Sequence, residues 1–386
     1  MDVEKKRFRI GLIINPIAGV GGKIGYKGSD GLEVEKAISE QGAEFQSPKR
    51  TREFLQALIP MQHEILFITV AGVMCSTILQ EFPFLFDLLT DQFLLESTEL
   101  FLTTSEHTKA AARALQTQQI DLLLFVGGDG TARDICEVVN QTIPVLGIPA
   151  GVKIHSSVFS VKPPDAAQIV RQYLHQEIPL REAEVLDIDE EKFRENQVIS
   201  KLYGYMRTPY APILSQPSKM ASPHTDQEFE NQARIAEWLL REWNQDNPET
   251  YYLLGPGTTT RAIAEVLDQP KSLLGVDLYY QKQRIVADLN EHALLENISG
   301  KQVKLIITPI GAQGFVFGRG NLQLSANVLS QIGSTNIQII ATKYKVSTLP
   351  NRKLRVDSRD PEFDKTFQGW HRVLVDFGEY NILEVI

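Results

Sequence analysis

Short apolar runs alternate with amphipathic stretches through the first half of the chain. The runs cover residues 8–14, 65–71, 120–126 and 143–148. Continuous apolar runs of this length are typical of parallel strands that are buried on both faces. After the third run the pattern changes to helical spacing, with Ile135, Val138 and Val139 on one face. The alternation of strand and helix predicts an α/β fold, a doubly wound N-terminal domain over residues 1–180.

Two local signals predict further helices in this domain. Thr103 and Glu106 have the spacing of a capping box, which predicts a helix after Thr103. Pro163-Pro164-Asp165 predicts the start of another helix, because proline fits the first helical turn. Residues 65–95 are the most apolar part of the chain, and we expect a buried strand and amphipathic helices there.

The pattern changes after residue 180. Residues 181–194 are strongly charged, and residues 198–206 alternate like an exposed strand. A helix then has Phe229, Ala233, Ala236, Leu240 and Trp243 on one face. Beyond this helix the chain consists mostly of short strand-like runs, at residues 251–254, 273–280, 284–288, 303–308 and 337–342. We therefore expect a second domain over residues 181–350.

The third apolar run leads into Gly127-Gly128-Asp129-Gly130-Thr131, a tight turn before a helix. Glycine lets the backbone approach a phosphate closely, and a helix N-terminus favours negative charge. Asp129 is the one reactive group in this turn. A carboxylate beside phosphate is unfavourable unless it positions a metal or accepts a proton. The alternative is that Asp129 only caps the helix that begins near Thr131.

Three other loops offer groups that suit a nucleotide. A glycine-rich loop after the first strand lacks the Gly-Lys-Ser/Thr ending of a Walker A loop. A loop after the fourth strand carries a glycine, a cation and hydroxyls, and an ordinary polar loop with an incidental His155 is the alternative. A second strand–turn–helix unit has more threonine hydroxyls than one cap needs. The candidate binding residues in these loops are Asn15, Gly19, Gly151, Lys153, Gly257, Thr258 and Thr259. Arg319, in a later glycine-rich segment, suits either a phosphate or a structural salt bridge.

The net charge and the amino-acid composition limit the classes of partner that the chain is expected to bind. The chain has 386 residues, a net charge of −9 and no long run of Lys or Arg, which argues against nucleic acid or an anionic membrane as a partner. A local nest of amides can still bind phosphate. The two cysteines, Cys75 and Cys136, have apolar neighbours and suit reduced thiols in a cytoplasmic protein. No apolar stretch approaches the roughly 20 residues that cross a bilayer.

Several short segments carry a resemblance to a known family. Gly127 to Thr131 resembles the turn of the NAD kinase superfamily, which also contains diacylglycerol and sphingosine kinases. Pro144 to Ile148 follows it as in NAD kinases, and Asn15 to Gly19 resembles the superfamily's first loop. Gly128 to Asp134, the turn at residues 255–260 and the segment at residues 311–321 look like the AcoX-like branch of the ATP-NAD kinases.

The resemblance implies a fold and a reaction. The fold would be an N-terminal α/β domain and a β-rich C-terminal domain, with residues 351–386 returning towards the first domain. The reaction would be phosphoryl transfer from ATP, with Mg²⁺, to the 2′-hydroxyl of NAD, which gives NADP. By position, Asp129 would be the general base, and homo-oligomers are the habit of the superfamily. The turn residues Gly127, Gly128, Gly130 and Thr131 would bind the nucleotide.

Two departures from the NAD kinase pattern bear on the acceptor. Asn290-Glu291 follows the turn at Gly257-Thr258-Thr259, whereas the family's Asn-Glu pair precedes the turn, so its NAD contact is not carried over. Ala132-Arg133-Asp134 also replaces the apolar residues usual after the glycine turn. The sequence leaves open the acceptor, the donor (ATP or polyphosphate) and the metal ligands.

Three other functions compete with an NAD kinase. A kinase could act on another small hydroxyl metabolite or on a lipid. A non-catalytic regulatory protein could bind nucleotides, but it has no chemical need for a carboxylate in the turn. A dehydrogenase is disfavoured, because no Gly-x-Gly-x-x-Gly unit with a downstream ribose-binding acid stands where the first strand meets its helix.

Overall fold

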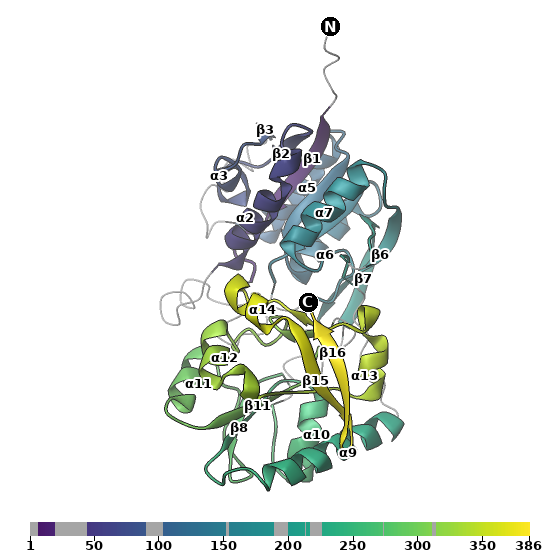
Figure 1. Ribbon diagram of the computed structural model, residues 1–386. Helices are drawn as coiled ribbons and strands as arrows, with labels where there is room; N and C mark the ends of the chain where they lie inside the picture. The colour runs from purple at the N-terminus through teal and green to yellow at the C-terminus, as the bar shows by residue number, and fades with distance from the viewer. Residues whose placement is uncertain are drawn as a thin grey trace. The chain divides into compact units, whose positions relative to one another are not determined.

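The computed structural model describes residues 7–19, 45–89, 103–151, 154–188, 200–212, 214–216, 226–272, 274–310 and 314–386. These residues form two compact units, the first up to residue 216 and the second from residue 226. Each unit has its own sheet and its own apolar core (Figure 1).

The first unit is built on a parallel five-stranded sheet. The strand order is β3 (Leu85–Leu88), β2 (Ile65–Thr69), β1 (Phe8–Ile14), β4 (Leu122–Gly127), β5 (Val145–Pro149). In chain order, β2 and β3 are added on one side of β1, and β4 and β5 are then added on its other side. The direction of building therefore reverses between β1 and β4, as in doubly wound sheets.

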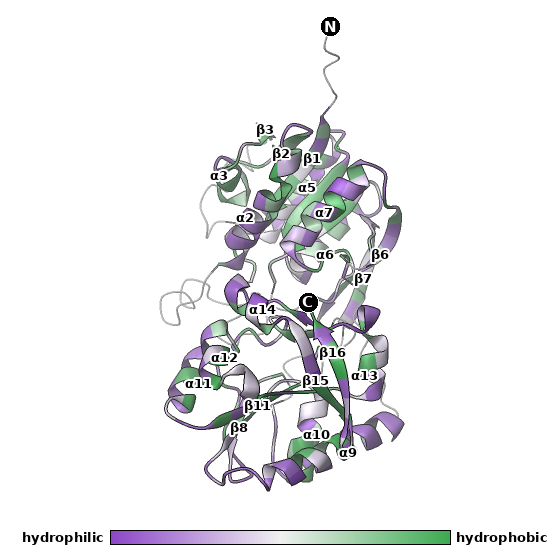
Figure 2. Cartoon of the chain, in the orientation of Figure 1, coloured by the Kyte–Doolittle hydropathy of each residue, from purple (hydrophilic) through white to green (hydrophobic). Residues whose placement is uncertain are grey.

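Helices cover both faces of this sheet. Phe54 of α2 (Gln46–Leu58) and Ile169 of α7 (Pro163–Leu174) share one core with Leu124 of β4. Ala111 of α5 (Ser105–Gln116) and Ile135 of α6 (Asp129–Val139) lie in a second core. Every residue of β4 is buried, as its apolar run predicted. In Figure 2 these strands are mainly hydrophobic, while the helices show both colours. The helical elements are α2 (Gln46–Leu58), η1 (Ile59–Met61), η2 (Gly72–Met74), α3 (Ser76–Leu79), α5 (Ser105–Gln116), α6 (Asp129–Val139) and α7 (Pro163–Leu174).

An antiparallel ribbon completes the first unit. It consists of β6 (Leu180–Ile188) and β7 (Ser200–Pro209). We expected residues from 181 onward in the second domain, but the ribbon belongs to the first. Val185 and Met206 are fully buried in the same core as Ile135 of α6, so the ribbon buries its apolar face there.

The second unit has a seven-stranded mixed sheet. β8, β11, β13 and β15 run parallel, and β9, β10 and β16 are antiparallel to their neighbours. The β-rich second domain is thus confirmed. The order is β10 (Gln283–Val286), β9 (Asp277–Tyr280), β8 (Tyr251–Leu254), β11 (Val303–Ile307), β13 (Ile337–Ile340), β15 (Gly369–Asp376), β16 (Glu379–Val385).

A short strand pair and several helices accompany this sheet. The pair is β12 (Phe315–Phe317) with β14 (Arg355–Val356). We expected residues 351–386 to return to the first domain, but they belong to the second unit, where Val373 and Leu383 are buried in its core. The helical elements are α9 (Asp226–Trp243), α10 (Thr258–Val266), α11 (Glu291–Ile298), α12 (Ala326–Ile332), η5 (Ser334–Asn336), α13 (Lys343–Thr348), η6 (Pro350–Arg352) and α14 (Pro361–Phe367).

Several local predictions need correction. The helix α5 is capped by Thr104 and not by Thr103, since the backbone N–H of Thr104 donates to His107 Nδ1 at 3.2 Å. Phe229 of α9 was expected on the buried face, but it is 49% exposed. The edge strand β3 was not foreseen, because two of its four residues, Leu85 and Leu88, are apolar yet exposed.

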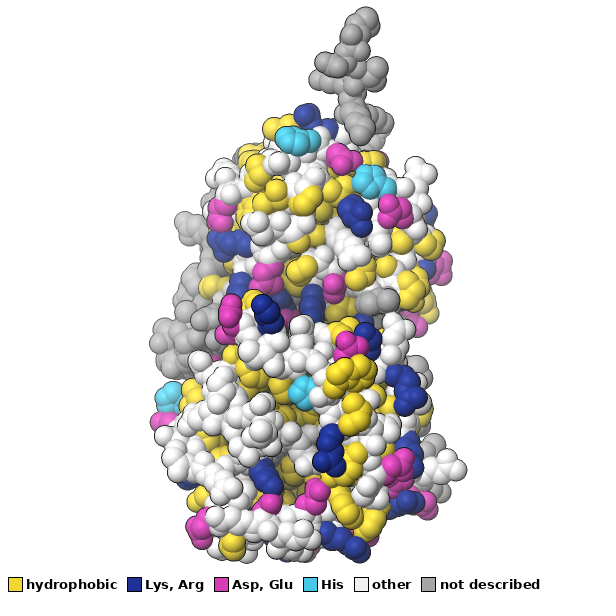
Figure 3. Space-filling model, in the orientation of Figure 1, with side chains coloured by type: hydrophobic (Ala, Val, Ile, Leu, Met, Phe, Trp, Pro, Cys, Tyr) yellow, Lys and Arg dark blue, Asp and Glu magenta, His cyan; other side chains and the backbone are white. Residues whose placement is uncertain are grey.

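The charges on the surface and the composition of the helices can be compared with what a nucleic acid or a membrane would require. On the face drawn in Figure 3, Lys and Arg side chains are interspersed with Asp and Glu side chains. None of the helices in the described ranges combines the length and the apolar composition that a bilayer crossing requires.

Candidate functional site

The first site lies where β1 and β4 end, at the reversal of strand order. Asn15 follows β1, and its backbone N–H donates to Val126 O of β4 at 2.9 Å. The Asn15 side-chain amide donates to Thr131 Oγ1 at 3.0 Å. Ligands of open α/β sheets bind outside the carboxyl ends of the strands at such a reversal. The first loop and the Gly127–Thr131 turn are therefore parts of one site.

Close backbone approach explains the glycines of this site. A Cβ on Gly19 would lie 2.2 Å from Ala150 O, and the φ of Gly19 is +83°. A Cβ on Gly127 would lie 2.4 Å from Thr131 Oγ1. The N–H of Gly151 donates to Gly127 O at 3.2 Å. The structure thus brings three separately predicted loops together.

Three candidate residues complete the account of this unit. Gly128 and Gly130 are partly exposed, on either side of the buried Asp129. A Cβ on Gly128 would lie 3.4 Å from the Gly151 Cα. Lys153 lies outside the described residues.

Asp129 binds the loop that follows β5. Its Oδ2 accepts a hydrogen bond from His155 N at 2.7 Å, and its Oδ1 accepts from Ser156 N at 3.0 Å and from Ser156 Oγ at 2.7 Å. The helix α6 begins at Asp129 itself, and no N–H of α6 donates to this carboxylate among the described residues. The interpretation of Asp129 as a helix cap is therefore wrong. Its carboxylate instead joins two loops at the strand ends.

Burial favours the neutral form of the Asp129 carboxyl group, because this residue is only 6% exposed. Burial raises the pKa of Asp129 from 3.8 to about 7, and the hydrogen bonds from Ser156 and His155 partly oppose this rise. The nearby Asp187 carboxylate adds to the rise in this pKa by like-charge repulsion. A carboxylate has about four lone-pair positions, and three are occupied here. The remaining position, on Oδ2, has no donor among the described residues.

The residues after the turn have structural roles. Ala132 is fully buried in the core between α6 and the sheet. Arg133 forms an ion pair with Asp187 of β6 at 2.8 Å and lies over the Tyr203 ring of β7, 5.6 Å from its centroid. The contacts of Arg133 anchor the β6–β7 ribbon, which explains why this position is not apolar.

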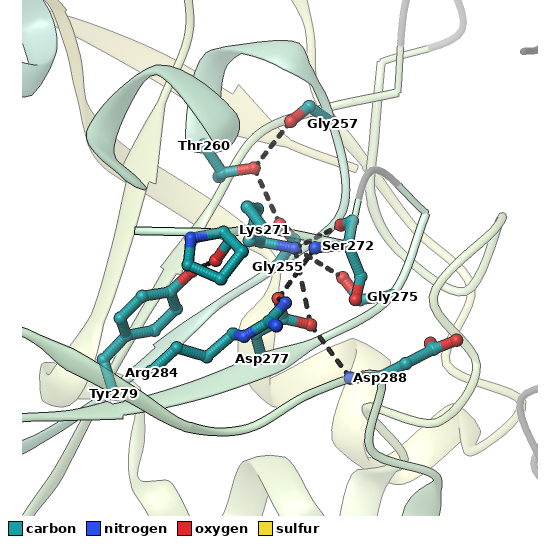
Figure 4. Close-up of polar contacts among 11 residues, drawn as sticks. Gly255, Gly257, Thr260, Lys271, Ser272, Gly275, Asp277, Tyr279, Arg284 and Asp288 are labelled. Carbon is teal, nitrogen blue, oxygen red and sulfur yellow. Dashed lines mark hydrogen bonds and ion pairs between the residues drawn. The ribbon is translucent and has the colours of Figure 1, made fainter. Parts of the chain in front are cut away.

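The second unit has a site of its own where β8 and β11 end. In this sheet β8 lies between its antiparallel neighbour β9 and its parallel neighbour β11. Gly257 has a φ of +125°, and a Cβ on it would lie 2.7 Å from Thr308 Cγ2, just after β11. The hydroxyl of Thr260 lies 2.7 Å from Gly255 O and 2.9 Å from Gly257 O, so it closes the turn (Figure 4).

The two other threonines of this turn differ in exposure. Thr258 is partly exposed, and its hydroxyl accepts a long hydrogen bond of 3.5 Å from Gln232 Nε2. Thr259 is fully buried, and its hydroxyl accepts a hydrogen bond of 2.9 Å from Lys345 Nζ. Lys345 also donates to Thr308 Oγ1 at 3.1 Å.

Sequence reasoning missed Lys345. Burial lowers the pKa of this lysine to about 8, and the negative charge of Glu228 opposes this lowering. The sequence feature that could have indicated a role for Lys345 is its place shortly after the strand expected at residues 337–342. That signal is weak, because lysines after strands are usually solvated.

A buried ion pair holds the chain next to this turn (Figure 4). Asp277 accepts hydrogen bonds from Ser272 N at 2.8 Å and from Asp288 N at 2.9 Å. The Lys271 Nζ lies 3.9 Å from Asp277 Oδ1 and donates to Gly275 O at 2.8 Å. Neither side chain of this pair is exposed. These groups are structural, because their contacts connect backbone within residues 271–288.

Two other candidates have structural contacts. The Arg319 side chain is 1% exposed and lies over the Phe315 ring, 5.1 Å from its centroid. Asn290 caps α11 by accepting a hydrogen bond from Ala293 N at 2.9 Å. This cap agrees with leaving the family's NAD contact unassigned at Asn290. No group of three or more His, Cys, Asp or Glu side chains that could hold a metal occurs in the described part of the chain.

Two family models match the chain. The model of the ATP-NAD kinase N-terminal domain matches residues 10–178, and that of the C-terminal domain matches residues 248–385. The chain belongs to the ATP-NAD kinase family. It is accordingly a kinase, a phosphotransferase. Comparison with curated proteins and with solved structures finds no match.

The two matches contain both sites of this ATP-NAD kinase family member. Asn15, Asp129 and Ser156 fall in the N-terminal match, and Thr259 and Lys345 fall in the C-terminal match. The assignment to the AcoX-like branch stays a prediction.

Proposed function

We propose that this kinase transfers the γ-phosphoryl group of ATP to the 2′-hydroxyl of the adenosine ribose of NAD, which gives NADP. The observation that carries the proposal is the buried Asp129, whose pKa is raised to about 7, in a glycine turn at the reversal of strand order. A general base works best when its pKa lies near the operating pH. The two family matches support NAD as the acceptor.

In the proposed reaction, the ribose 2′-oxygen attacks the γ-phosphorus, and the bond to the β–γ bridging oxygen breaks. The hydroxyl proton passes to the remaining lone pair of Asp129 Oδ2, and ADP leaves with the bridging oxygen. Phosphoryl transfer depends mainly on alignment and on neutralisation of charge. The backbone N–H groups of the Gly127–Thr131 turn and the N-terminus of α6 suit the second task.

The family uses ATP and a divalent cation. The described residues do not provide a closed protein cage for a metal. Mg²⁺ usually keeps several waters and binds substrate phosphates with few protein ligands. We therefore propose that Mg²⁺ enters as the complex with ATP, where it neutralises phosphate charge.

The first test is direct. Purified protein is mixed with NAD and Mg²⁺ and either ATP or polyphosphate, and NADP is measured with an NADP-specific dehydrogenase. We expect NADP with ATP and a loss of about 10²–10⁴-fold in kcat for Asp129→Asn. Glu137→Gln is the matched control, because Glu137 lies on the same helix and its side chain is 61% exposed. NAD and ATP that bind without any turnover would instead support a regulatory protein.

A second variant separates a base from a structural carboxylate. The side-chain hydrogen bond from Ser156 lowers the pKa of Asp129, so Ser156→Ala is expected to raise this pKa further. The acid limb of the pH–rate profile should then move to higher pH, while Asp129 keeps its two backbone donors. An acid limb at the same pH in both proteins would refute Asp129 as the base.

The proposed partners are nucleotides, and the proposed compartment is the cytoplasm. Cys75 and Cys136 are buried free thiols, which suits a reducing compartment.

A further inference from the structure

A buried lysine joins the carboxyl ends of three neighbouring strands in the second unit. β8, β11 and β13 are adjacent and parallel. Thr259 lies in the helix turn after β8, Thr308 directly follows β11, and Lys345 lies in α13 after β13. The Lys345 Nζ donates to both threonine hydroxyls, at 2.9 and 3.1 Å. The three residues are 0%, 2% and 5% exposed in chain order.

Lys345 has neutral partners only. It forms no ion pair with any carboxylate of the described chain, and both of its side-chain acceptors are hydroxyl oxygens. The Glu228 Oε1 accepts a hydrogen bond from Thr342 Oγ1 at 2.7 Å and acts on Lys345 only through its charge. A buried cation is unfavourable without a paired anion. The ammonium group therefore has no direct anionic partner among the described residues, and Glu228 offsets its charge only from a distance.

The hydrogen count gives a second, independent indication. Both threonine oxygens accept from Lys345, so each hydroxyl hydrogen points away from the ammonium group. Within the described ranges, neither hydroxyl has an acceptor, and the ammonium donates only two of its three hydrogens. Three buried donor hydrogens of this cluster thus have no acceptor within the described ranges. Buried polar groups are normally paired, so these donors suit a ligand that supplies oxygen acceptors.

The place of the cluster agrees with this indication. It lies at the carboxyl ends of the parallel strands β8, β11 and β13, the edge at which open α/β sheets bind ligands. Gly257 and Thr258, next to Thr259, are partly exposed, and the N-terminus of α10 adds positive charge. We propose that Thr259, Thr308 and Lys345 bind a phosphate group of a nucleotide at this position in the second unit. Naming a nucleotide rests on the proposed function, whereas the anion site itself does not.

The test measures binding of defined anions by calorimetry on the full chain. The probes are inorganic pyrophosphate, ATP and NAD, which separate the shared phosphate chemistry from its two nucleotide sources. Lys345→Met is expected to weaken binding of pyrophosphate and of at least one nucleotide by about 10–100-fold, because a charged hydrogen bond is lost. Lys343→Met is the control on the same helix, since Lys343 is 53% exposed and pairs with Asp376 and Glu379.

Thr308 gives a second variant that does not depend on the fold of Lys345→Met. Thr308→Val keeps the shape but removes the hydroxyl, and we expect a loss of about 3–10-fold in affinity. Thr308→Ser should recover most of that loss, because it restores the hydroxyl. Tryptophan fluorescence of Trp238 and Trp243, on α9 of the same unit, checks that each variant is folded.

The possible outcomes test the proposed phosphate site and the proposed kinase reaction independently. Anion binding that depends on Lys345, in a protein that forms no NADP, supports this site and refutes the proposed function. NADP formation with an unchanged KM for ATP and NAD in folded Lys345→Met refutes the site alone. Failure of the wild-type chain to bind any of the three probes, or equal binding by wild type, Lys345→Met and Thr308→Val, also overturns it.

Discussion

Protonation of Asp129 should couple pH to the stability of the first unit. The pKa of this carboxyl is about 7 in the folded chain and 3.8 as its ordinary value. Between these values the folded state holds a proton that the unfolded state has lost. The free energy of unfolding therefore falls as the pH rises from about 4 to about 7 and is level above that. At about 1.36 kcal/mol per pKa unit, the contribution of Asp129 amounts to about 4 kcal/mol.

The variant Asp129→Asn isolates this contribution, because an amide has no proton to lose. Its NH₂ group would face a donating N–H of His155 or Ser156, which costs about 1–3 kcal/mol at every pH. At pH 4 the variant should thus be less stable than wild type. At pH 8 it should be at least as stable, because only wild type then carries a buried charge. The difference between the two proteins should change by about 4 kcal/mol over this range.

Hydrogen exchange resolves the first unit from the second. The exchange of amides in β4, corrected for the intrinsic rate at each pH, reports the opening free energy beside Asp129. All three tryptophans, Trp238, Trp243 and Trp370, lie in the second unit, so their fluorescence serves as an internal control. Glu137→Gln should parallel wild type between about pH 5 and pH 8, because the hydrogen bond from Lys109 lowers the pKa of Glu137 and this carboxylate stays ionised over that range. Parallel pH curves for wild type and Asp129→Asn would refute the reasoning, because they would mean that the pKa of Asp129 does not change on folding.

Three other predictions concern the second unit and use urea unfolding followed by tryptophan fluorescence. Asp277→Ala is expected to cost about 3–5 kcal/mol, since Lys271 would stay buried without its carboxylate; a loss below about 1 kcal/mol would contradict this. Gly257→Ala should cost about 1–3 kcal/mol, because its φ of +125° and the Thr308 methyl at 2.7 Å both resist a Cβ; an unchanged midpoint would show that the turn relaxes freely. Trp370→Ser should change stability by less than about 0.5 kcal/mol, because Trp370 is 72% exposed; a larger loss would reveal a packing role on this surface.

The sequence by itself determined the strands and turns whose formation depends on residues close together in the chain. The continuous apolar runs in the first half of the chain form buried strands. Successive side chains of a strand point to opposite faces of the sheet, so an all-apolar strand needs helices packed on both faces. The glycine turns came directly after the same runs. The Gly127–Thr131 motif also pointed to the family that the two domain matches show.

Only the tertiary structure decided which loops meet. Strand order is a non-local property, so the sequence could not show that Asn15 and Thr131, 116 residues apart, share a hydrogen bond. The same reason hid the donors of Asp129, which lie 26 and 27 residues away, and so the helix-cap alternative stayed open until the loops were placed.

Burial of single polar side chains was also beyond the sequence. Lys345 looks like an ordinary surface lysine until β8, β11 and β13 are set side by side and bring Thr259 and Thr308 to its amine. The β6–β7 ribbon was likewise assigned by its packing against α6, not by the charge of residues 181–194. Local patterns record what each segment must cover, and only the folded chain decides which segment covers it.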